Sequence, residues 1–175
     1  IHNIDAIPFN HNEIDNWRNN YKGIRYYSAK YQYDFGGAID EVWQKNNGEL
    51  IIADIKATSR NNFNWSDTWD KYDYPKSYKR QLEMYQWLFK MNGFKVSNEA
   101  YIIYFNGNKN EKFFKNTLSF DVHFIKLNCS TDWVEQKIIE TVDFLRSEIF
   151  PSPSHKCENC NYLKKRWNLS KKLKI

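Results

Sequence analysis

The sequence predicts an α/β domain with a mixed central sheet flanked by helices. Three observations support this. Two strands in residues 35–59 are joined by a polar turn at Asn46–Gly48, residues 76–91 have the period of an amphipathic helix, and residues 100–105 form an apolar run typical of a buried strand. The 175 residues are enough for one domain with a substantial core.

The first half of the chain is expected to contribute a short helix and three strands. Asn10 or Asn12 caps the helix, which continues to about Tyr21, where Gly23 follows. Tyrosine-rich residues 24–33 and residues 35–43 read as strands, and residues 49–57 as the next one. We expect these strands to form a three-stranded antiparallel meander.

The second half is expected to alternate loop, helix, strand, strand and helix. Residues 60–74 show no regular period and read as a loop, whose Phe63, Trp65 and Trp69 either stack on bases or pack against the domain. Pro75 opens the helix over residues 76–91, and Asn92-Gly93 ends it. Residues 117–127 alternate as an outer strand, and a helix follows over residues 132–148.

Chemistry is expected where the strand 49–57 carries Asp54 and Lys56. Residues two apart on a strand point to the same face, so the carboxylate and the ammonium emerge side by side. Pairing through the polar turn brings Asp40 close to them. Two carboxylates and a lysine make a site for a divalent cation with a group that handles protons. The alternative is an exposed ion pair, worth about 0–1 kcal/mol.

Three segments carry a family resemblance. Gly37-Ala-Ile-Asp40, the later Asp54-Ile-Lys56 and the helix segment Arg80-Gln-Leu-Glu-Met-Tyr85 occur in order and at suitable spacing. This pattern resembles the PD-(D/E)XK nuclease superfamily, and the Q-x-x-x-Y formed by Gln81 and Tyr85 resembles its RecB-like branch. The likeness runs from about residue 4 to residue 162. It implies a restriction-endonuclease-like core within a nuclease-like domain over residues 1–163, followed by a basic tail over residues 164–175.

The resemblance also implies the roles of the site residues. Asp40, Asp54 and the backbone carbonyl of Ile55 would hold Mg2+ or Mn2+. Lys56 would orient or deprotonate the attacking water or neutralise charge at phosphorus, and Gln81 and Tyr85 would contact the water, Lys56 or the phosphate. Contacts to nucleic acid are expected from six residues: Thr58, Ser59, Arg60, Trp65, Lys79 and Arg80.

Two features depart from the family pattern. RecB-like nucleases place a further His or Glu ligand upstream, where this sequence has His2, His11 and Glu13 as candidates, or the helix that carries the ligand lies outside the sequence. Several relatives hold an iron–sulfur cluster. Cys157 and Cys160 form a C-x-x-C, but Arg166 stands where a third Cys would fall. The pair could be half of a zinc or cluster site that residues absent from the sequence complete, with or without His155.

Net charge, the length of apolar runs and the cysteine count limit the kinds of partner and the cell compartment that we expect. The net charge of +5 is compatible with a polyanion, no apolar run is long enough to cross a bilayer, and three Cys fit a reduced compartment. We expect an intracellular, nucleoid-associated protein that is not membrane-bound. The resemblance implies a DNA nuclease of the exonuclease type, acting in repair, recombination or mobile-element processing with a helicase or recombination partner. The alternatives are a catalytically weak nucleic-acid-binding module of the same fold and a protein-interaction domain.

Overall fold

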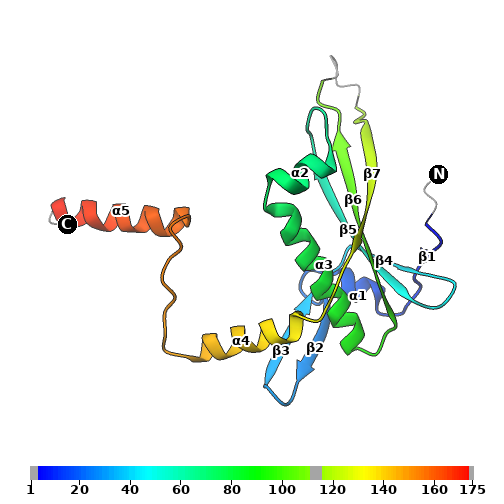
Figure 1. The fold of residues 1–175 in the computed structure, drawn as a ribbon, viewed down its shortest axis with the longest axis horizontal. Coiled ribbons are helices and arrows are strands. Elements are labelled where there is room, and N and C mark those ends of the chain that lie inside the picture. The colour runs from blue at the N-terminus through cyan, green and yellow to red at the C-terminus, as the bar shows by residue number, and fades with distance from the viewer. Residues whose placement is uncertain (1–3, 111–115, 174–175) are drawn as a thin grey trace. The chain divides into compact units, whose positions relative to one another are not determined.

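The computed structural model describes residues 4–110 and 116–173 (Figure 1). The chain divides into two compact units, with the boundary between Ile139 and Glu140. Within the described ranges, none of the helices has the length and apolar character needed to cross a membrane.

Seven strands and five helices are present in the described residues. In chain order they are β1 (Ile7–Pro8), α1 (Ile14–Arg18), β2 (Ile24–Ser28), β3 (Tyr33–Gly37), β4 (Glu41–Gln44), β5 (Leu50–Thr58), α2 (Trp65–Lys71), α3 (Tyr74–Met91), β6 (Val96–Gly107), β7 (Phe120–Asn128), α4 (Val134–Arg146) and α5 (Glu158–Leu173).

The central sheet has five strands in the order β1-β4-β5-β6-β7. β4 and β5 pair antiparallel across the polar turn, whereas β5 and β6 pair in parallel, with α2 and α3 in the connection between them. A parallel pair needs such a crossover, since a short hairpin cannot reverse the chain twice. β7 lies at one edge, antiparallel to β6. The predicted α/β class, with a mixed sheet flanked by helices, is confirmed.

The predicted meander is wrong in its first half. The expected strands 24–33 and 35–43 do not join the central sheet as two neighbouring strands. Instead, β2 and β3 pair with each other in a separate two-stranded sheet, from Ile24↔Gly37 to Ser28↔Tyr33. The strand expected over residues 35–43 is interrupted at Ala38–Asp40, where the chain leaves the hairpin and enters the central sheet as β4. The sequence pattern could not show this, because both pieces have strand composition.

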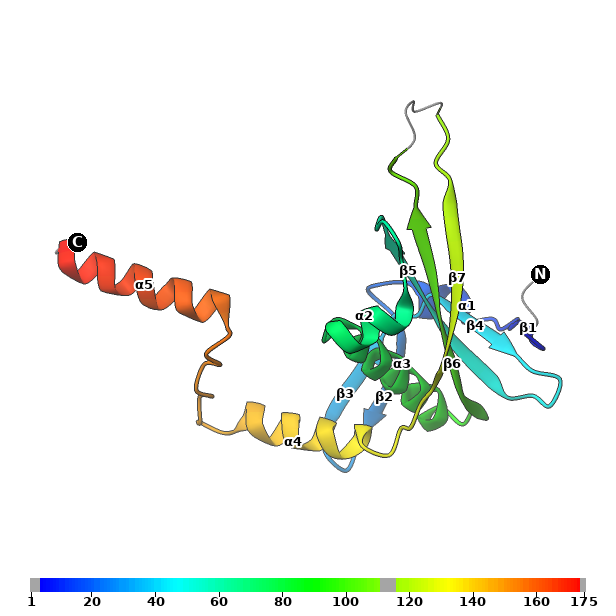
Figure 2. The same cartoon turned by 45° about the horizontal axis from the view of Figure 1, so that its top comes forward.

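Helix α3 covers one face of the central sheet and carries the β2–β3 hairpin on its other side (Figure 2). Its Leu82 and Phe89 are fully buried, as are Ile52 on β5 and Ile102 on β6. Trp87 of α3 packs edge-on against Tyr26 and Phe35 of the hairpin. The helix ends as predicted at Asn92-Gly93, since Gly93 has a φ of +85° and donates its N–H to the Lys90 carbonyl.

Two local predictions need correction. Residues 60–74 are not a loop throughout, because α2 forms within them. Asn64 caps this helix by accepting the Ser66 N–H at 3.0 Å, a helix-start signal that the aromatic composition obscured. The first helix, expected to reach Tyr21, spans only Ile14–Arg18.

The second unit contains the end of α4 and all of α5. The basic segment expected as a tail from residue 164 is helical up to Leu173, and the last two residues lie outside the described ranges. Cys157 and Cys160 stand at the beginning of α5.

Candidate active site

Strand β5 places Asp54 and Lys56 on the sheet face that α3 covers. Asp54 shares this face with the core residue Ile52, because side chains alternate along a strand. Its carboxylate Oδ2 lies 2.6 Å from Lys56 Nζ, with the Asp54 side chain 4% exposed and that of Lys56 21% exposed. The ion pair is therefore withdrawn from solvent, unlike the exposed pair that was its alternative.

Asp40 lies directly before the first residue of β4, and its carboxylate reaches the same point. The ladder between β4 and β5 ends at Glu41↔Ala53, and beyond it the Asp40 carboxylate accepts the Ile55 N–H at 2.7 Å. The N–H and C=O of one residue point to the same side of a strand. The Ile55 carbonyl is thus expected to face the side where Asp40 lies, while the Ile55 side chain is exposed.

Helix α3 supplies a hydrogen-bonded chain that leads to Lys56. Lys56 Nζ donates to Gln81 Oε1 at 3.3 Å, and Gln81 Nε2 donates to the Tyr85 hydroxyl at 2.8 Å. The Tyr85 ring lies against Gly37, where a Cβ would come within 2.7 Å of Tyr85 Cε1. A glycine at position 37 therefore makes room for the ring.

Tyr78 is a site residue that sequence reasoning assigned only to the apolar stripe of the helix. Its ring centroid lies 4.8 Å from Lys56 Nζ, a distance at which the ring face attracts the ammonium. Its spacing from Gln81 and Tyr85 is i, i+3 and i+7, which is the signal that could have placed all three on one helix face.

Burial dominates the electrostatics of the carboxylate pair. It raises the pKa of Asp54, the neighbouring Lys56 ammonium opposes this, and the negative charge of Asp40 raises the pKa further. Burial also raises the pKa of Tyr85, against the hydrogen bond from Gln81, so the hydroxyl is neutral near pH 7. A cation between the two carboxylates would relieve their repulsion.

The residues present fit a hard divalent cation. Asp54 Oδ2 is buried and makes no hydrogen bond of good geometry within the described ranges, although the Lys56 ammonium lies 2.6 Å from it. Asp40 is exposed, which leaves one side open to water and substrate. Mg2+ takes one or two carboxylates and keeps several waters. Across the described parts of the chain, no group of three or more His, Cys, Asp or Glu side chains is gathered for a metal.

The candidate upstream ligands are engaged elsewhere. The His11 ring stacks on Trp17 at 4.5 Å, and its Nδ1 accepts the Glu13 N–H. The Glu13 carboxylate accepts a hydrogen bond from the Asn16 side chain at 2.7 Å. Neither His11 nor Glu13 joins Asp40 and Asp54 as a third metal ligand in the described structure. His2 lies outside the described residues.

The residues expected to contact nucleic acid lie in three places: the end of β5, helix α2 and helix α3. Thr58, Ser59 and Arg60 are at the end of β5, and the Arg60 guanidinium lies over the rings of Tyr72 and Tyr74 at 5.2 and 5.3 Å. Trp65 opens α2 and packs against Trp69 and Tyr104.

The other two expected contacts are on α3. Lys79 Nζ lies 3.7 Å from a carboxylate oxygen of Glu83, whereas Arg80 is exposed. Arg80 and Gln81 line one hollow of about 310 Å³, so a cation stands beside the hydrogen-bonded chain that leads to Lys56.

The C-x-x-C does not complete a metal site with described residues. Cys157 Sγ accepts the Cys160 N–H at 3.3 Å, and the Cys160 thiol and N–H lower the pKa of Cys157. Cys129 is buried in the other unit, where burial raises its pKa to about 12. Two thiolates fall short of the four ligands that zinc or a cluster takes. A zinc ion or cluster at Cys157 and Cys160 stays a prediction.

Comparison with known proteins identifies one family. A family model described as the PD-(D/E)XK nuclease superfamily matches residues 7–164, a span that includes every residue of the Asp40, Asp54, Lys56, Gln81 and Tyr85 cluster. No curated protein and no solved structure matches the chain. The match is to the superfamily and does not separate its branches.

Proposed function

Because the chain belongs to the PD-(D/E)XK nuclease superfamily, we propose that it is a metal-dependent DNA nuclease that hydrolyses phosphodiester bonds. The observation that carries this proposal is the withdrawn Asp54–Lys56 ion pair beside the Asp40 carboxylate. The desolvation of both groups opposes folding, so a buried pair of this kind favours a functional use for its charges.

The metal-binding roles are assigned to Asp40, Asp54 and the Ile55 carbonyl. Bound Mg2+ or Mn2+ would lower the pKa of a coordinated water and polarise a phosphoryl oxygen. Asp40 and Asp54 supply the two negative charges, and the exposed side of Asp40 leaves room for the phosphate. The hydrogen bond from the Ile55 N–H uses Asp40 Oδ2, so Asp40 Oδ1 would remain available to a cation.

The roles around the phosphate are assigned to Lys56, Gln81 and Tyr85. Lys56 would orient or deprotonate the attacking water or neutralise charge that develops on the phosphate. Gln81 holds the Lys56 ammonium in place, and the Tyr85 hydroxyl fixes the orientation of the Gln81 amide. A preorganised ammonium stabilises developing charge without a cost of reorganisation at the moment of reaction.

The finer assignment within the superfamily follows from the Gln81 and Tyr85 pattern. It makes the protein a RecB-like exonuclease acting in DNA repair, recombination or mobile-element processing, with a helicase or recombination protein as partner and the nucleoid as location. The residues proposed to contact the DNA are Thr58, Ser59, Arg60, Trp65, Lys79 and Arg80. The domain proposed for this role covers residues 1–163.

A second candidate is a nucleic-acid-binding module with weak catalysis. It is favoured by one observation, that no third acidic or histidine ligand joins Asp40 and Asp54 in the described ranges. Lys56 can also neutralise Asp54 without a metal.

Metal binding separates these candidates independently of activity. Calorimetric titration with Mn2+ is expected to show binding to the wild type that is lost in Asp40→Ala/Asp54→Ala. Asp15→Ala, which removes an exposed carboxylate from α1, is the matched control and should bind like the wild type. Equal Mn2+ binding by the wild type and the double variant would contradict the proposed metal site.

A further inference from the structure

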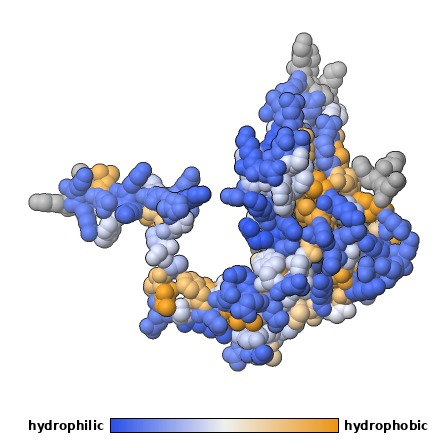
Figure 3. Space-filling model, viewed as in Figure 1, coloured by the Kyte–Doolittle hydropathy of each residue, from blue (hydrophilic) through white to orange (hydrophobic). Residues whose placement is uncertain are grey.

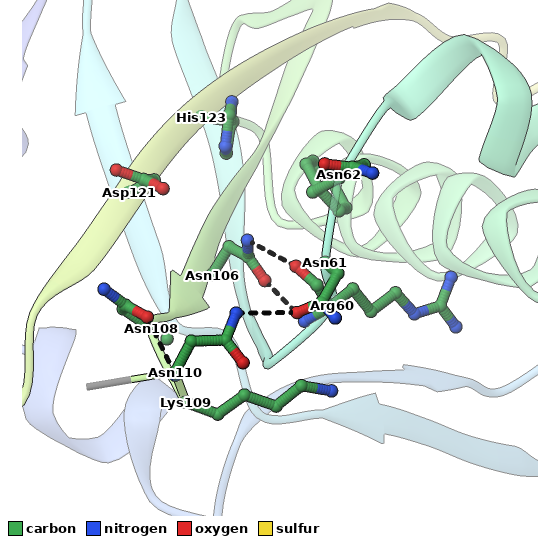
Figure 4. A pocket seen from close by; sticks show the side chains of 11 residues that line it. Arg60, Asn61, Asn62, Asn106, Asn108, Lys109, Asn110, Asp121 and His123 are labelled. Atoms are coloured by element: carbon green, nitrogen blue, oxygen red, sulfur yellow. Dashed lines mark hydrogen bonds between the residues drawn. The ribbon is translucent and has the colours of Figure 1, made fainter. Parts of the chain in front are cut away.

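A polar hollow of about 600 Å³ lies where β5 and β6 end, beyond the catalytic pair (Figure 4). Asparagine side chains line much of it, together with Lys109, Asp121 and His123. Figure 3 shows hydrophilic side chains covering this end of the sheet. The family match and the motif residues assign no role to this hollow.

The hollow and the catalytic pair lie on one face of the sheet. Lys56 on β5 is in register with Tyr104 on β6, which is in register with His123 on β7. Two residues further along β5, Thr58 is in register with Asn106 on β6, which is in register with Asp121 on β7. Residues paired across strands point to the same face, so the catalytic pair and the hollow share one face, with the buried Tyr104 between them under Phe63 and Trp65.

The separation of the two sites along the strands is short on the scale of a nucleic acid strand. Thr58 and Asn106 lie two residues beyond Lys56 and Tyr104, which is about 7 Å at the usual rise of a strand. One strand of duplex DNA advances about 3.4 Å per nucleotide, and an unpaired strand can extend further, so the hollow is about one or two nucleotides from the phosphate at the catalytic pair.

The wall of the hollow is held rigidly. The Asn106 side chain accepts the Arg60 N–H at 2.8 Å and donates to the Arg60 carbonyl at 3.0 Å, which fixes the segment after β5 (Figure 4). Phe63 packs over Tyr104 and His123, with both ring-centroid distances at 4.8 Å. Phe63 is thus part of the wall rather than a free stacking platform.

The groups that face the hollow suit the edge of a base better than a phosphate alone. The Arg60 guanidinium points away from it, so Lys109, which donates to the Ser59 carbonyl at 3.2 Å, is the main cation (Figure 4). Asp121 presents a carboxylate, which repels phosphate but accepts hydrogen bonds from an amino group. Asn62 and Asn108 add amides that can both donate and accept.

We propose that this hollow binds an unpaired nucleotide of the substrate strand and favours a base that carries an exocyclic amino group. This inference rests on the proposed nuclease function. Asp121 accepts from the amino group, such as N4 of cytosine, whereas thymine presents the acceptor O4 at the corresponding position and is repelled. Lys109 pairs with the neighbouring phosphate. Paired DNA presents the amino group only on the floor of the major groove, whereas an unpaired base can enter the hollow, so we take DNA with a single-stranded segment as the substrate class.

The test compares oligo-dC with oligo-dT of equal length, about 12 nucleotides, which is long enough to reach both sites even at the duplex rise of about 3.4 Å per nucleotide. Fluorescence anisotropy in EDTA measures binding without cleavage. We expect the wild type to bind oligo-dC about tenfold more tightly than oligo-dT. Asp121→Ala should bring the ratio close to one, while Asp15→Ala, an exposed carboxylate elsewhere, should keep it. The ratio is used because loss of any negative charge raises affinity for both strands.

Other results would overturn the inference. Equal binding of the two strands by the wild type, an unchanged ratio in Asp121→Ala, or no binding of either strand would each contradict it. Failure of the proposed nuclease function appears separately, as absence of cleavage of both oligonucleotides when Mg2+ or Mn2+ is added. If the wild type prefers oligo-dC, Asp121→Ala removes the preference, and neither oligonucleotide is cleaved, the nucleotide site would stand and the nuclease function would be rejected.

Discussion

Asp40 continues the hydrogen bonding of β4 with its side chain, since its carboxylate accepts the Ile55 N–H at 2.7 Å just beyond the last backbone pair of the two strands. Its own carbonyl accepts from Arg18 Nε at 3.1 Å, which ties the backbone at this position to α1. Asp40 is therefore held through both its backbone carbonyl and its side-chain carboxylate before any cation binds.

This double role of Asp40 predicts a difference between two substitutions. Asp40→Asn keeps an acceptor for the Ile55 N–H but removes the charge, so it should fold with nearly wild-type stability and lose cleavage. Asp40→Ala leaves that N–H without its acceptor and should lower the free energy of unfolding by about 1 kcal/mol more than Asp40→Asn. Urea denaturation and a cleavage assay measure the two effects. Equal stability of the variants would show that the hydrogen bond contributes little.

The contact between Gly37 and Tyr85 predicts a steric effect. Gly37→Ala would place a Cβ within 2.7 Å of Tyr85 Cε1, and the crowding should lower the free energy of unfolding by about 1–3 kcal/mol and disturb the chain that leads to Lys56. The matched experiment repeats the substitution in a Tyr85→Ala background, where the ring is absent. The cost should then largely disappear, because interacting residues are not additive. The same cost in both backgrounds would mean that another contact is responsible.

The hydrogen bonds of Gln81 predict graded effects on catalysis. A lysine has only donors, so the Gln81 oxygen faces Lys56 and its NH2 group faces the Tyr85 hydroxyl. Gln81→Ala should lower kcat by about tenfold or more, with little change in KM, as expected for a group that positions a catalytic side chain. Tyr85→Phe keeps the ring against Gly37 and should have a smaller effect. A larger loss in Tyr85→Phe than in Gln81→Ala would reverse the proposed order of roles.

The fold and the site differ in how far the sequence predicts them. Side-chain alternation was enough to place Asp54 and Lys56 together, and the i, i+4 spacing placed Gln81 and Tyr85 together, because both rules act within a single element. Burial of the ion pair could not be predicted, since it depends on α3 lying over that face of the sheet.

The errors arose where the chain passes from one element to another. Residues 33–44 have strand composition throughout, but the break at Ala38–Asp40 sends the two parts into different sheets. Nothing local distinguishes a continuous strand from two strands separated by a short crossing. The same is true of α2, where the capping residue Asn64 was a weaker signal than the surrounding aromatic residues.

Glu99 predicts a pH dependence of stability at the other end of the sheet. Its hydrogen bonds with Lys126 and Lys45 lower the pKa of its carboxyl below the ordinary value of 4.5. The stabilisation is therefore complete above pH 4.5 and is lost as the pH falls from there through the lowered pKa. Glu99→Gln should reduce the free energy of unfolding by about 1 kcal/mol near neutral pH, and the difference from the wild type should narrow in acid.

Denaturation across that pH range measures the difference. Glu49→Gln serves as the control, because the Glu49 carboxylate lies further from its lysine, at 3.5 Å from Lys95 Nζ. A difference between wild type and Glu99→Gln that grows as the pH falls would have the wrong sign for a lowered pKa.

The most direct test of the nuclease is cleavage of end-labelled single- and double-stranded DNA with Mg2+ or Mn2+. Wild type, Asp54→Ala and Lys56→Ala are compared, with Asp15→Ala as control and EDTA as blank. We predict products that require the divalent cation, are absent with both Asp54→Ala and Lys56→Ala, and persist with Asp15→Ala. Products that are equally abundant with Asp54→Ala, or a folded wild type that binds DNA and cuts neither substrate, would contradict catalysis at the Asp54–Lys56 pair.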